Sequence, residues 1–429
     1  MSLDLGVPGF GFASDLCGFA GFGFFGEGDG MTDRQAMYLG LVITCFVIGC
    51  AAVAPQPEAP GAAGMWTGSE TLYPAPFHVR ESDGHEIWRW GFINARGRTV
   101  VEPRYDDVCE FSEGLAAVNL GGKHGKDFRP GKSQGGVWGF IDETGRIVVP
   151  LKYEKVKPFS EGLGAVVVSG EDRFVFIDRG GTIVIRGEGG WPVAASFAEG
   201  LAAVRDGEDN WTYIDRSGRS AMKEVFVTVQ PFSEGLAGVD KGRPIDDYKG
   251  LVSSGQVGYI DPTGRWVVLP RFSGGTEFRE GLAAVNTGGK GDPPLVWGGK
   301  WGFIDNKGQW AIPPSFDWAL PFYEGLAGVC RGAQTERGLP SGGLWGYVNR
   351  TGQVIIPFLY EDIGCFSAGL APVCLKGKYG FIDHGGRLRI DYRFERAEMF
   401  REGLAYVREN GLWKYIAPDG KTVWSQSGN

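Results

Sequence analysis

The chain has 429 residues and a formal net charge of −8, from 43 Lys and Arg against 51 Asp and Glu. This acidic balance argues against nonspecific nucleic-acid binding, which requires a basic face to displace phosphate counterions, and a hydrophobic content of 43% excludes a disordered chain. Glycine is the outlier, with 72 residues where an average protein of this length has about 30. We therefore expect a fold with many turns.

Residues 1–30 are rich in Gly and Phe, carry four acidic residues and no basic one, and differ from the positive leader of a signal peptide. We interpret them as a non-native or disordered extension, with translation beginning at Met31. Residues 31–50 then form a signal peptide. Their apolar stretch, 37–49, would extend only ~20 Å as a helix, which is short of the ~30 Å hydrocarbon core of a bilayer.

The signal peptide ends in Val47-Ile48-Gly49-Cys50, which resembles a bacterial lipobox. The resemblance implies that Cys50 is lipidated and becomes the mature N-terminus of a membrane-anchored lipoprotein in the cell envelope, facing the periplasm or the surface. Residues 51–71 have the Pro/Ala/Gly composition of a linker. The alternative is a single-pass transmembrane anchor, since the 18 uncharged residues 37–54 approach the ~20 needed to span a bilayer.

Residues 72–424 form a repeat domain, followed by a tail at 425–429. One unit recurs eight times, and its clearest copy reads WGFIDETGRIVVP at 138–150 and FSEGLGAV at 159–166. A ninth half-unit, WKYIAPDGKTVW, ends the domain. Because the spacing between the two motifs is nearly constant, each unit predicts one structural module. The aromatic position of the first motif is occupied by Trp90, Trp138, Phe174, Trp211, Val257, Trp301, Trp345, Tyr379 and Trp413.

Each unit contains two turns that join short β-rich segments. In the D-x-x-G turn, Asp142 and its equivalents can accept backbone hydrogen bonds, and Gly145 and its equivalents supply the positive φ of a three-residue hairpin loop. In the S-E-G-L turn, Gly occupies all eight positions, which predicts a left-handed backbone site. The x position of the following strand, G-L-A-x-V, is small except at Tyr406. We expect a bulky neighbour there, most simply a Trp of an adjacent hairpin, and Tyr406 at the end of the array.

This pattern resembles the bacterial WG-repeat family, and the resemblance covers residues 90–424. It implies an all-β array of tandem β-hairpin repeats with surface or envelope roles and no general chemistry. The signature dipeptide Trp-Gly is present at 138–139, 301–302 and 345–346. It is replaced at 174–175, 211–212 and 413–414.

The array is either open and twisted, like a β-solenoid, or closed into a propeller-like ring. A closed propeller completes its last blade with a strand from the N-terminus, and residues 76–79 could mimic a G-L-A-x-V strand in front of the first unit. The half-unit at 413–424 then adds a surplus hairpin. Because the count overshoots a ring, we expect an open array.

No residue pattern points to catalysis, a metal or a cofactor. Carboxylates such as Asp142 and Glu161 suit general acid and base work, but an active site is needed once, and these residues recur at turn positions with local backbone roles. One or two carboxylates per unit fall short of a divalent-cation site. The four His are scattered, and no nucleotide-binding fingerprint has its required context. We expect a protein that is not an enzyme.

Four cysteines follow Cys50. Cys330 and Cys374 come just after G-L-A-x-V in successive units, at a position that is Asn, Asp or Arg in most others. We interpret this position as exposed to solvent, where two cysteines on stacked units could form a disulfide if their Cα atoms lie within about 7 Å. Two unpaired thiols are the alternative. Cys109 and Cys365 are expected to be small core residues.

Four connections between G-L-A-x-V and the next unit are expanded, at 119–137, 240–256, 286–300 and 330–344. Because they enter at the same point of the module, we expect them on one side of the array, where repeat proteins often bind partners. Their surplus of basic residues would orient an acidic partner, such as a lipid headgroup or an acidic protein. The candidate binding residues in the first are Lys123, Lys126, Arg129 and Lys132.

Two function classes fit these features. The first is a noncatalytic binding or scaffold protein that holds an envelope protein. The alternative is a carbohydrate or cell-wall binding module, in which exposed aromatic rings stack on sugars. The burial of the repeat tryptophans discriminates between them. The small x position predicts that these side chains are buried, which favours the first class; they are Trp90, Trp138, Trp211, Trp301, Trp345 and Trp413.

Overall fold

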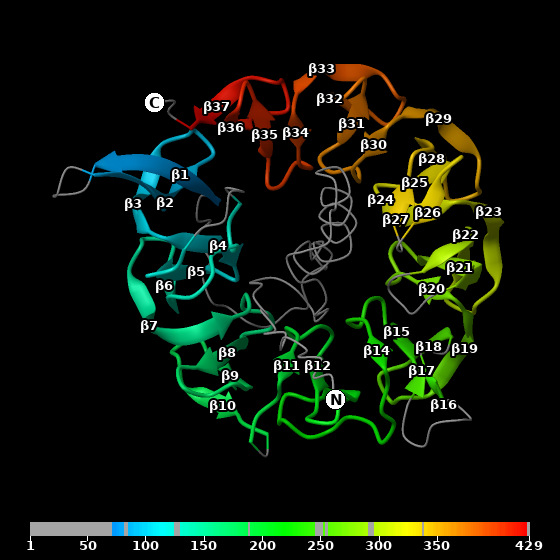
Figure 1. Cartoon of the computed structure of the whole chain (residues 1–429), viewed down its shortest axis with the longest axis horizontal. Coiled ribbons are helices and arrows are strands. Elements are labelled where there is room, and N and C mark those ends of the chain that lie inside the picture. The colour runs from blue at the N-terminus through cyan, green and yellow to red at the C-terminus, as the bar shows by residue number, and fades with distance from the viewer. Residues whose placement is uncertain are drawn as a thin grey trace, which may run out of the picture.

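The computed structural model describes residues 71–80, 85–123, 129–187, 189–244, 252–253, 256–290, 296–336 and 339–426. These ranges contain strands and turns and no helix, so the prediction of an all-β repeat array is confirmed. Neighbouring strands pair antiparallel into groups that we call blades. In the described part of the chain nine blades follow one another around a ring (Figure 1).

The first four blades contain strands β1 to β13, and the first expanded connection lies in blade 2. Blade 1 contains β1 (Leu72–Arg80), β2 (Glu86–Asn94) and β3 (Thr99–Tyr105). Blade 2 contains β4 (Asp107–Ser112), β5 (Leu115–Leu120), β6 (Val137–Asp142) and β7 (Ile147–Val156). Blade 3 contains β8 (Gly164–Val168), β9 (Phe174–Ile177) and β10 (Ile183–Ile185), and blade 4 contains β11 (Val193–Ala194), β12 (Ala202–Arg205) and β13 (Trp211–Ile214). Strand β7 pairs with both β6 and β8 and so joins blades 2 and 3.

The next three blades carry three of the four expanded connections between strands. Blade 5 contains β14 (Thr228–Val229), β15 (Ala237–Asp240), β18 (Val257–Ile260) and β19 (Trp266–Phe272), with the small hairpin β16 (Arg243–Pro244) and β17 (Val252–Ser253). Blade 6 contains β20 (Gly274–Gly275), β21 (Leu282–Lys290), β22 (Trp297–Asp305) and β23 (Trp310–Phe316). Blade 7 contains β24 (Trp318–Tyr323), β25 (Leu326–Arg331), β28 (Leu344–Asn349) and β29 (Val354–Tyr360), with the small hairpin β26 (Gln334–Glu336) and β27 (Leu339–Ser341).

The last two blades are compact. Blade 8 contains β30 (Asp362–Ile363), β31 (Ala371–Leu375), β32 (Lys378–Ile382) and β33 (Leu388–Phe394). Blade 9 contains β34 (Arg396–Ala397), β35 (Ala405–Glu409), β36 (Leu412–Ile416) and β37 (Thr422–Ser425). Within a four-stranded blade the first strand lies toward the centre of the ring and the last on its outer edge (Figure 1).

The two ends of the array meet, so the expectation of an open array is wrong. Strand β1 lies beside blade 9 (Figure 1), and side chains from both ends form one buried cluster. The ring of Phe77 is 5.6 Å from that of Trp424. Gly97 packs so closely on Val423 that a Cβ atom would lie 2.2 Å from its carbonyl oxygen. The D-x-x-G glycine of an interior blade, such as Gly145, contacts the preceding blade in the same way.

The repeat and the blade are offset by half a unit, which explains the miscount. A blade takes its first two strands from one repeat and its last two from the next. The half-unit at 413–424 is therefore not surplus, because it completes blade 9. Strand β1 provides the G-L-A-x-V strand of blade 1, but in a different register from the one expected. Leu72 pairs with Asn94 and Ala75 with Gly91, so residues 72–75, and not 76–79, take that place.

The repeat tryptophans fill the core, as predicted. Their exposed fractions lie between 0% and 8% for Trp90, Trp138, Trp211, Trp301, Trp345 and Trp413. The bulky neighbour of the x position differs from the one expected. A Cβ atom on Gly328 would lie 2.4 Å from Cδ1 of Ile363, which belongs to the first strand of the next blade. The x position is small because an inner strand, and not a Trp, packs on it.

Candidate partner-binding face

The four expanded connections all join the second strand of a blade to the third. They are β5 to β6, β15 to β18, β21 to β22 and β25 to β28. Because every blade has the same strand order and antiparallel pairing, these connections leave the same face of the ring. We call the connections the arms and this side of the ring the arm face. The D-x-x-G and S-E-G-L turns lie on the opposite face.

At the base of three arms, a glycine on the outgoing chain packs closely against a glycine on the returning chain. We call this contact the glycine crossing. A Cβ atom on Gly121, Gly288 or Gly332 would meet the Cα of the glycine on the returning strand, at 3.6, 3.9 and 3.8 Å. Each of the six glycines has a positive φ between 69° and 83°, a conformation that residues with a Cβ rarely adopt. Glycine therefore permits the close crossing from which each arm rises. The partners on the returning strands are Gly136, Gly299 and Gly343.

Buried polar side chains hold the base of the first and third arms. The amide of Asn119 donates to Gly135 O at 3.1 Å, and its oxygen accepts from Gly122 N at 2.9 Å. Asn286 makes the equivalent bonds in the third arm. Asp107 also accepts from two backbone N–H groups of the first arm. The arm bases are therefore built into the blades, because buried hydrogen bonds fix their exit direction.

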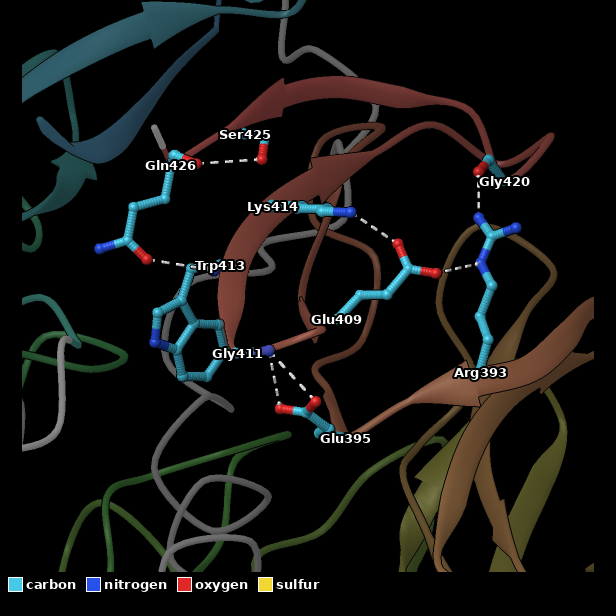
Figure 2. A network of polar contacts seen from close by, with 9 residues as sticks. All are labelled: Arg393, Glu395, Glu409, Gly411, Trp413, Lys414, Gly420, Ser425 and Gln426. Atoms are coloured by element: carbon cyan, nitrogen blue, oxygen red, sulfur yellow. Dashed lines mark hydrogen bonds and ion pairs between the residues drawn. The ribbon is translucent and has the colours of Figure 1, made fainter. Parts of the chain in front are cut away.

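An acidic side chain at the joint between two blades accepts a hydrogen bond from the backbone N–H of the glycine that comes just after the second strand of a blade. Asp106 accepts a hydrogen bond from Gly121 N and Asp317 from Gly332 N, both at 2.6 Å. Figure 2 shows the equivalent contact in blade 9, where the carboxylate of Glu395 faces Gly411 N at 3.2 Å. These residues were not predicted from the sequence. Their signal is an acidic residue directly after the aromatic that ends an outer strand, as in Tyr105-Asp106.

The structure brings only part of the predicted basic set to the surface. Lys123 is exposed, whereas Arg129 and Lys132 are half-buried, and Lys126 lies outside the described residues. Other exposed cations of the arm face are Lys241, Lys290 and Arg331. The guanidinium of Arg331 lies 4.8 Å from the ring of Phe358 and 5.3 Å from that of Phe316.

The interpretation of Cys330 and Cys374 as exposed is wrong. Their exposed fractions are 0% and 5%, and neither forms a disulfide, which agrees with the second of the two alternatives. Burial raises the pKa of the Cys330 thiol to about 12. The position is buried in other blades too, because Asn119, Asp240 and Asn286 fill it with side chains that serve the arms. The prediction that Cys109 and Cys365 are core residues is confirmed.

On the opposite face the two repeated carboxylates have different roles. The D-x-x-G aspartates have the local role predicted, since Asp142 accepts from Thr144 N and Arg146 N at 3.0 Å. The S-E-G-L glutamates instead link blades, so their predicted local role is wrong. The carboxylate of Glu161, for example, accepts from Gly200 N in the next blade at 3.0 Å. Equivalent links join Glu113 to Gly162, Glu199 to Gly235, Glu234 to Gly281, Glu280 to Gly325 and Glu324 to Gly369.

The predicted lipidation site, Cys50, and the signal peptide at 31–50 lie outside the described residues. Within the described ranges, no helix has the length and apolar character needed to cross a membrane. The same ranges contain no group of three or more His, Cys, Asp or Glu side chains arranged to hold a metal ion.

Comparison with known proteins identifies the repeat. The WG containing repeat family matches residues 90–123, 138–171, 211–243, 258–290, 301–333, 345–379 and 379–413, more than half of the chain. The segment between 171 and 211, whose unit begins with Phe174-Val175, is not among these matches. No curated protein matches the chain.

Solved structures with a similar fold are distant in sequence. A eukaryotic initiation factor matches 84% of this chain and 96% of its own, at 12% identity and a TM-score of 0.53. BamB from Moraxella catarrhalis matches 76% of this chain and 93% of its own, at 11% identity and a TM-score of 0.35. AztD from Citrobacter koseri, in its apo form, matches 83% of this chain and 94% of its own, at 14% identity and a TM-score of 0.36. At such identities the likeness concerns the fold alone.

Proposed function

Because the chain belongs to the WG containing repeat family, we propose that it is a noncatalytic binding or scaffold protein of the bacterial cell envelope, which holds an acidic partner on its arm face. The observation that carries the proposal is the shared construction of the arms. Three of them leave one face through the same glycine crossing, and exposed cations lie at their bases. Exposed cations at the bases of several connections on one face suit recognition of a negatively charged envelope protein or cell-wall component.

The burial of the repeat tryptophans disfavours the carbohydrate-binding alternative. Sugar stacking needs an exposed aromatic face, and Trp138, Trp301 and Trp345 are at most 4% exposed. Trp310, at 40% exposure, is on the outer strand β23 and not on the arm face. The arms therefore remain the better candidate for contact with a partner.

Membrane attachment completes the proposal. A lipid chain on Cys50, followed by the linker 51–71, would tether the ring to a bilayer and leave the arm face free. A single-pass anchor formed by 37–54 would do the same. Both alternatives place the ring in the envelope, and the lipidation test in the Discussion separates them.

Charge reversal on the arm face tests the proposal. The variant Lys123→Glu/Lys241→Glu/Lys290→Glu changes three exposed cations of the arm bases. We expect it to weaken the binding of poly-L-glutamate, measured by fluorescence anisotropy at low salt, by at least tenfold. The matched control reverses three exposed cations of D-x-x-G-type turns on the opposite face and should bind as the wild type does. It is Arg96→Glu/Arg179→Glu/Lys307→Glu. Equal losses in the two variants would remove the arm face as the binding surface.

A further inference from the structure

The joint between blade 9 and blade 1, which we call the seam, is built differently from every interior joint. At an interior joint the chain continues from one blade into the next, and at most of them the outer strand runs directly into the next inner strand, as β23 ends at Phe316 and β24 begins at Trp318. Within the described residues, blade 1 has no strand inside β1, and the sheet order is β1-β2-β3. The seam therefore has no covalent connection through the outer edge of blade 9.

Blade 1 has no described inner strand, and strand β1 accepts the tyrosine hydrogen bond that the backbone of the next blade accepts elsewhere in the ring. At three interior joints a tyrosine of the third strand donates to a backbone carbonyl of the next blade, as Tyr259 does to Thr276 O at 2.8 Å and Tyr347 to Gly364 O at 2.7 Å. At the seam, Tyr415 donates to Pro74 O of β1 at 2.9 Å. The same contact thus closes the ring, with β1 as its acceptor.

Two other polar contacts at the seam are made by the side chains of Tyr73 and Arg401. The hydroxyl of Tyr73 donates to the backbone carbonyl of Glu402, at the turn where interior blades use the glutamate-to-glycine link. The guanidinium of Arg401 forms an ion pair with Glu110 on β4, so that it reaches past blade 1 to blade 2. Pro74 and Pro76 have no backbone N–H, so β1 offers no donors at these positions for a further strand.

The rest of the seam is an aromatic cluster. Tyr406 stacks on Trp413 with ring centres 4.5 Å apart and an angle of 5° between the planes. Tyr73 packs on Tyr415 at 5.5 Å. The contact between Tyr73 and Tyr415 depends on the nine-residue strand β1 being in place, whereas Tyr406 and Trp413 both belong to blade 9.

We propose that β1 is a latch, and that the ring opens at the seam before any other blade joint separates. An interior joint stays connected by the chain and by hydrogen bonds between blades, such as the one from Gly325 N to Glu280, so its two blades remain together when one contact breaks. At the seam, release of β1 removes the Tyr415 hydrogen bond, the Tyr73 hydrogen bond and the aromatic packing together. The open form exposes the aromatic surface of blade 9.

Native-state hydrogen exchange of the full chain, in detergent and at low denaturant concentration, tests the latch. We expect peptides covering 72–80 and 405–416 to open together and to exchange at least tenfold faster than peptides covering 282–290 and 301–305, at the interior of blade 6. Equal protection of the seam and of blade 6 would overturn the proposal, because it would mean that the seam opens only with global unfolding.

A pair of matched variants adds a second measurement. Tyr415→Phe and Tyr259→Phe each remove one hydroxyl from the same position of a blade, at the seam and at an interior joint. We expect Tyr415→Phe to accelerate exchange of the seam peptides by about three- to tenfold, the effect of one buried hydrogen bond. Tyr259→Phe should leave the seam peptides unchanged. If the two variants accelerate seam exchange equally, opening at the seam is not a separate event and the latch is excluded.

Discussion

The carboxylate of Glu324 in blade 7 accepts a hydrogen bond of 3.0 Å from Gly369 N in blade 8. Its oxygen also lies 3.1 Å from Nε2 of His384, which belongs to the D-x-x-G turn of blade 8. Glu324 has a φ of 50°, a left-handed conformation that is unfavourable for a residue with a side chain. The Glu324 side chain is long enough to reach the next blade, whereas Ala368 at the equivalent turn of blade 8 is too short to do so.

Replacement of Glu324 measures the inter-blade link. Glu324→Ala should lower the free energy of unfolding by about 1 kcal/mol, the typical net value of one hydrogen bond. Glu224→Ala, at an exposed position of blade 4, should change it by less than about 0.5 kcal/mol. Denaturant melts of both variants provide the measurement. Identical midpoints for the two would mean that the link contributes nothing, as a purely local turn role predicts.

The buried tryptophans should dominate the stability of the blades. Trp301 is 3% exposed, and Trp301→Ala should cost about 3 to 5 kcal/mol, the range for removing a large buried aromatic. Trp310→Ala is the control, because this side chain is 40% exposed and should cost clearly less. Urea melts rank the two variants. The opposite order would contradict the assignment of the repeat tryptophans to the core and would revive the ligand-facing alternative.

Asp362 should make the protein less stable as pH rises. Burial raises the pKa of this carboxyl from 3.8 to about 6, and a hydrogen bond from Tyr379 lowers it only in part. Because the folded pKa lies above the unfolded one, the contribution of Asp362 is complete below about pH 4 and is lost as pH rises through about 6. Asp362→Asn should therefore stabilise the protein at pH 7.5, by at most about 3 kcal/mol.

Asp261 provides the control for this experiment, because its pKa shifts in the other direction. A hydrogen bond from the Thr263 side chain lowers the pKa of Asp261 to about 2, so its contribution is present at neutral pH and is lost as pH falls through about 2. Asp261→Asn should be neutral or destabilising at pH 7.5. Thermal melts between pH 4 and 8 give both results. Destabilisation by Asp362→Asn at pH 7.5 would contradict the assigned sign.

Lipidation of Cys50 is tested by fractionation of cells that express the full chain or Cys50→Ala. We expect the wild type in the membrane fraction and the variant largely in the soluble fraction, because two or three acyl chains anchor a protein firmly at about 0.8 kcal/mol per buried methylene. Mass spectrometry of the wild type should find a modified Cys50 at the N-terminus. Equal membrane retention of the two proteins would favour the transmembrane alternative.

Local chemistry within the repeat was enough to predict the elements of this fold. The D-x-x-G aspartates and the positive φ of the S-E-G-L glycines were identified from the residues alone, since a turn requires its residue types within a few positions of one another. The burial of Trp138, Trp301 and Trp345 was also predicted correctly, although the small x position that suggested it is contacted by an inner strand and not by a Trp. The S-E-G-L glycine recurs in all eight units and the turn aspartate in most of them, and this repetition separated them from chance.

Only the tertiary structure decided how the units meet. The closure of the ring depends on Tyr415 and Pro74, which lie 341 positions apart, and no spacing within a repeat reports on such a contact. The same holds for Cys330, which the pattern Asn, Asp or Arg suggested to be exposed. In two other blades the equivalent position holds Asn119 or Asn286. These side chains can be buried because their polar atoms form hydrogen bonds to the arms. A polar residue signals exposure only when the fold gives it no buried partner.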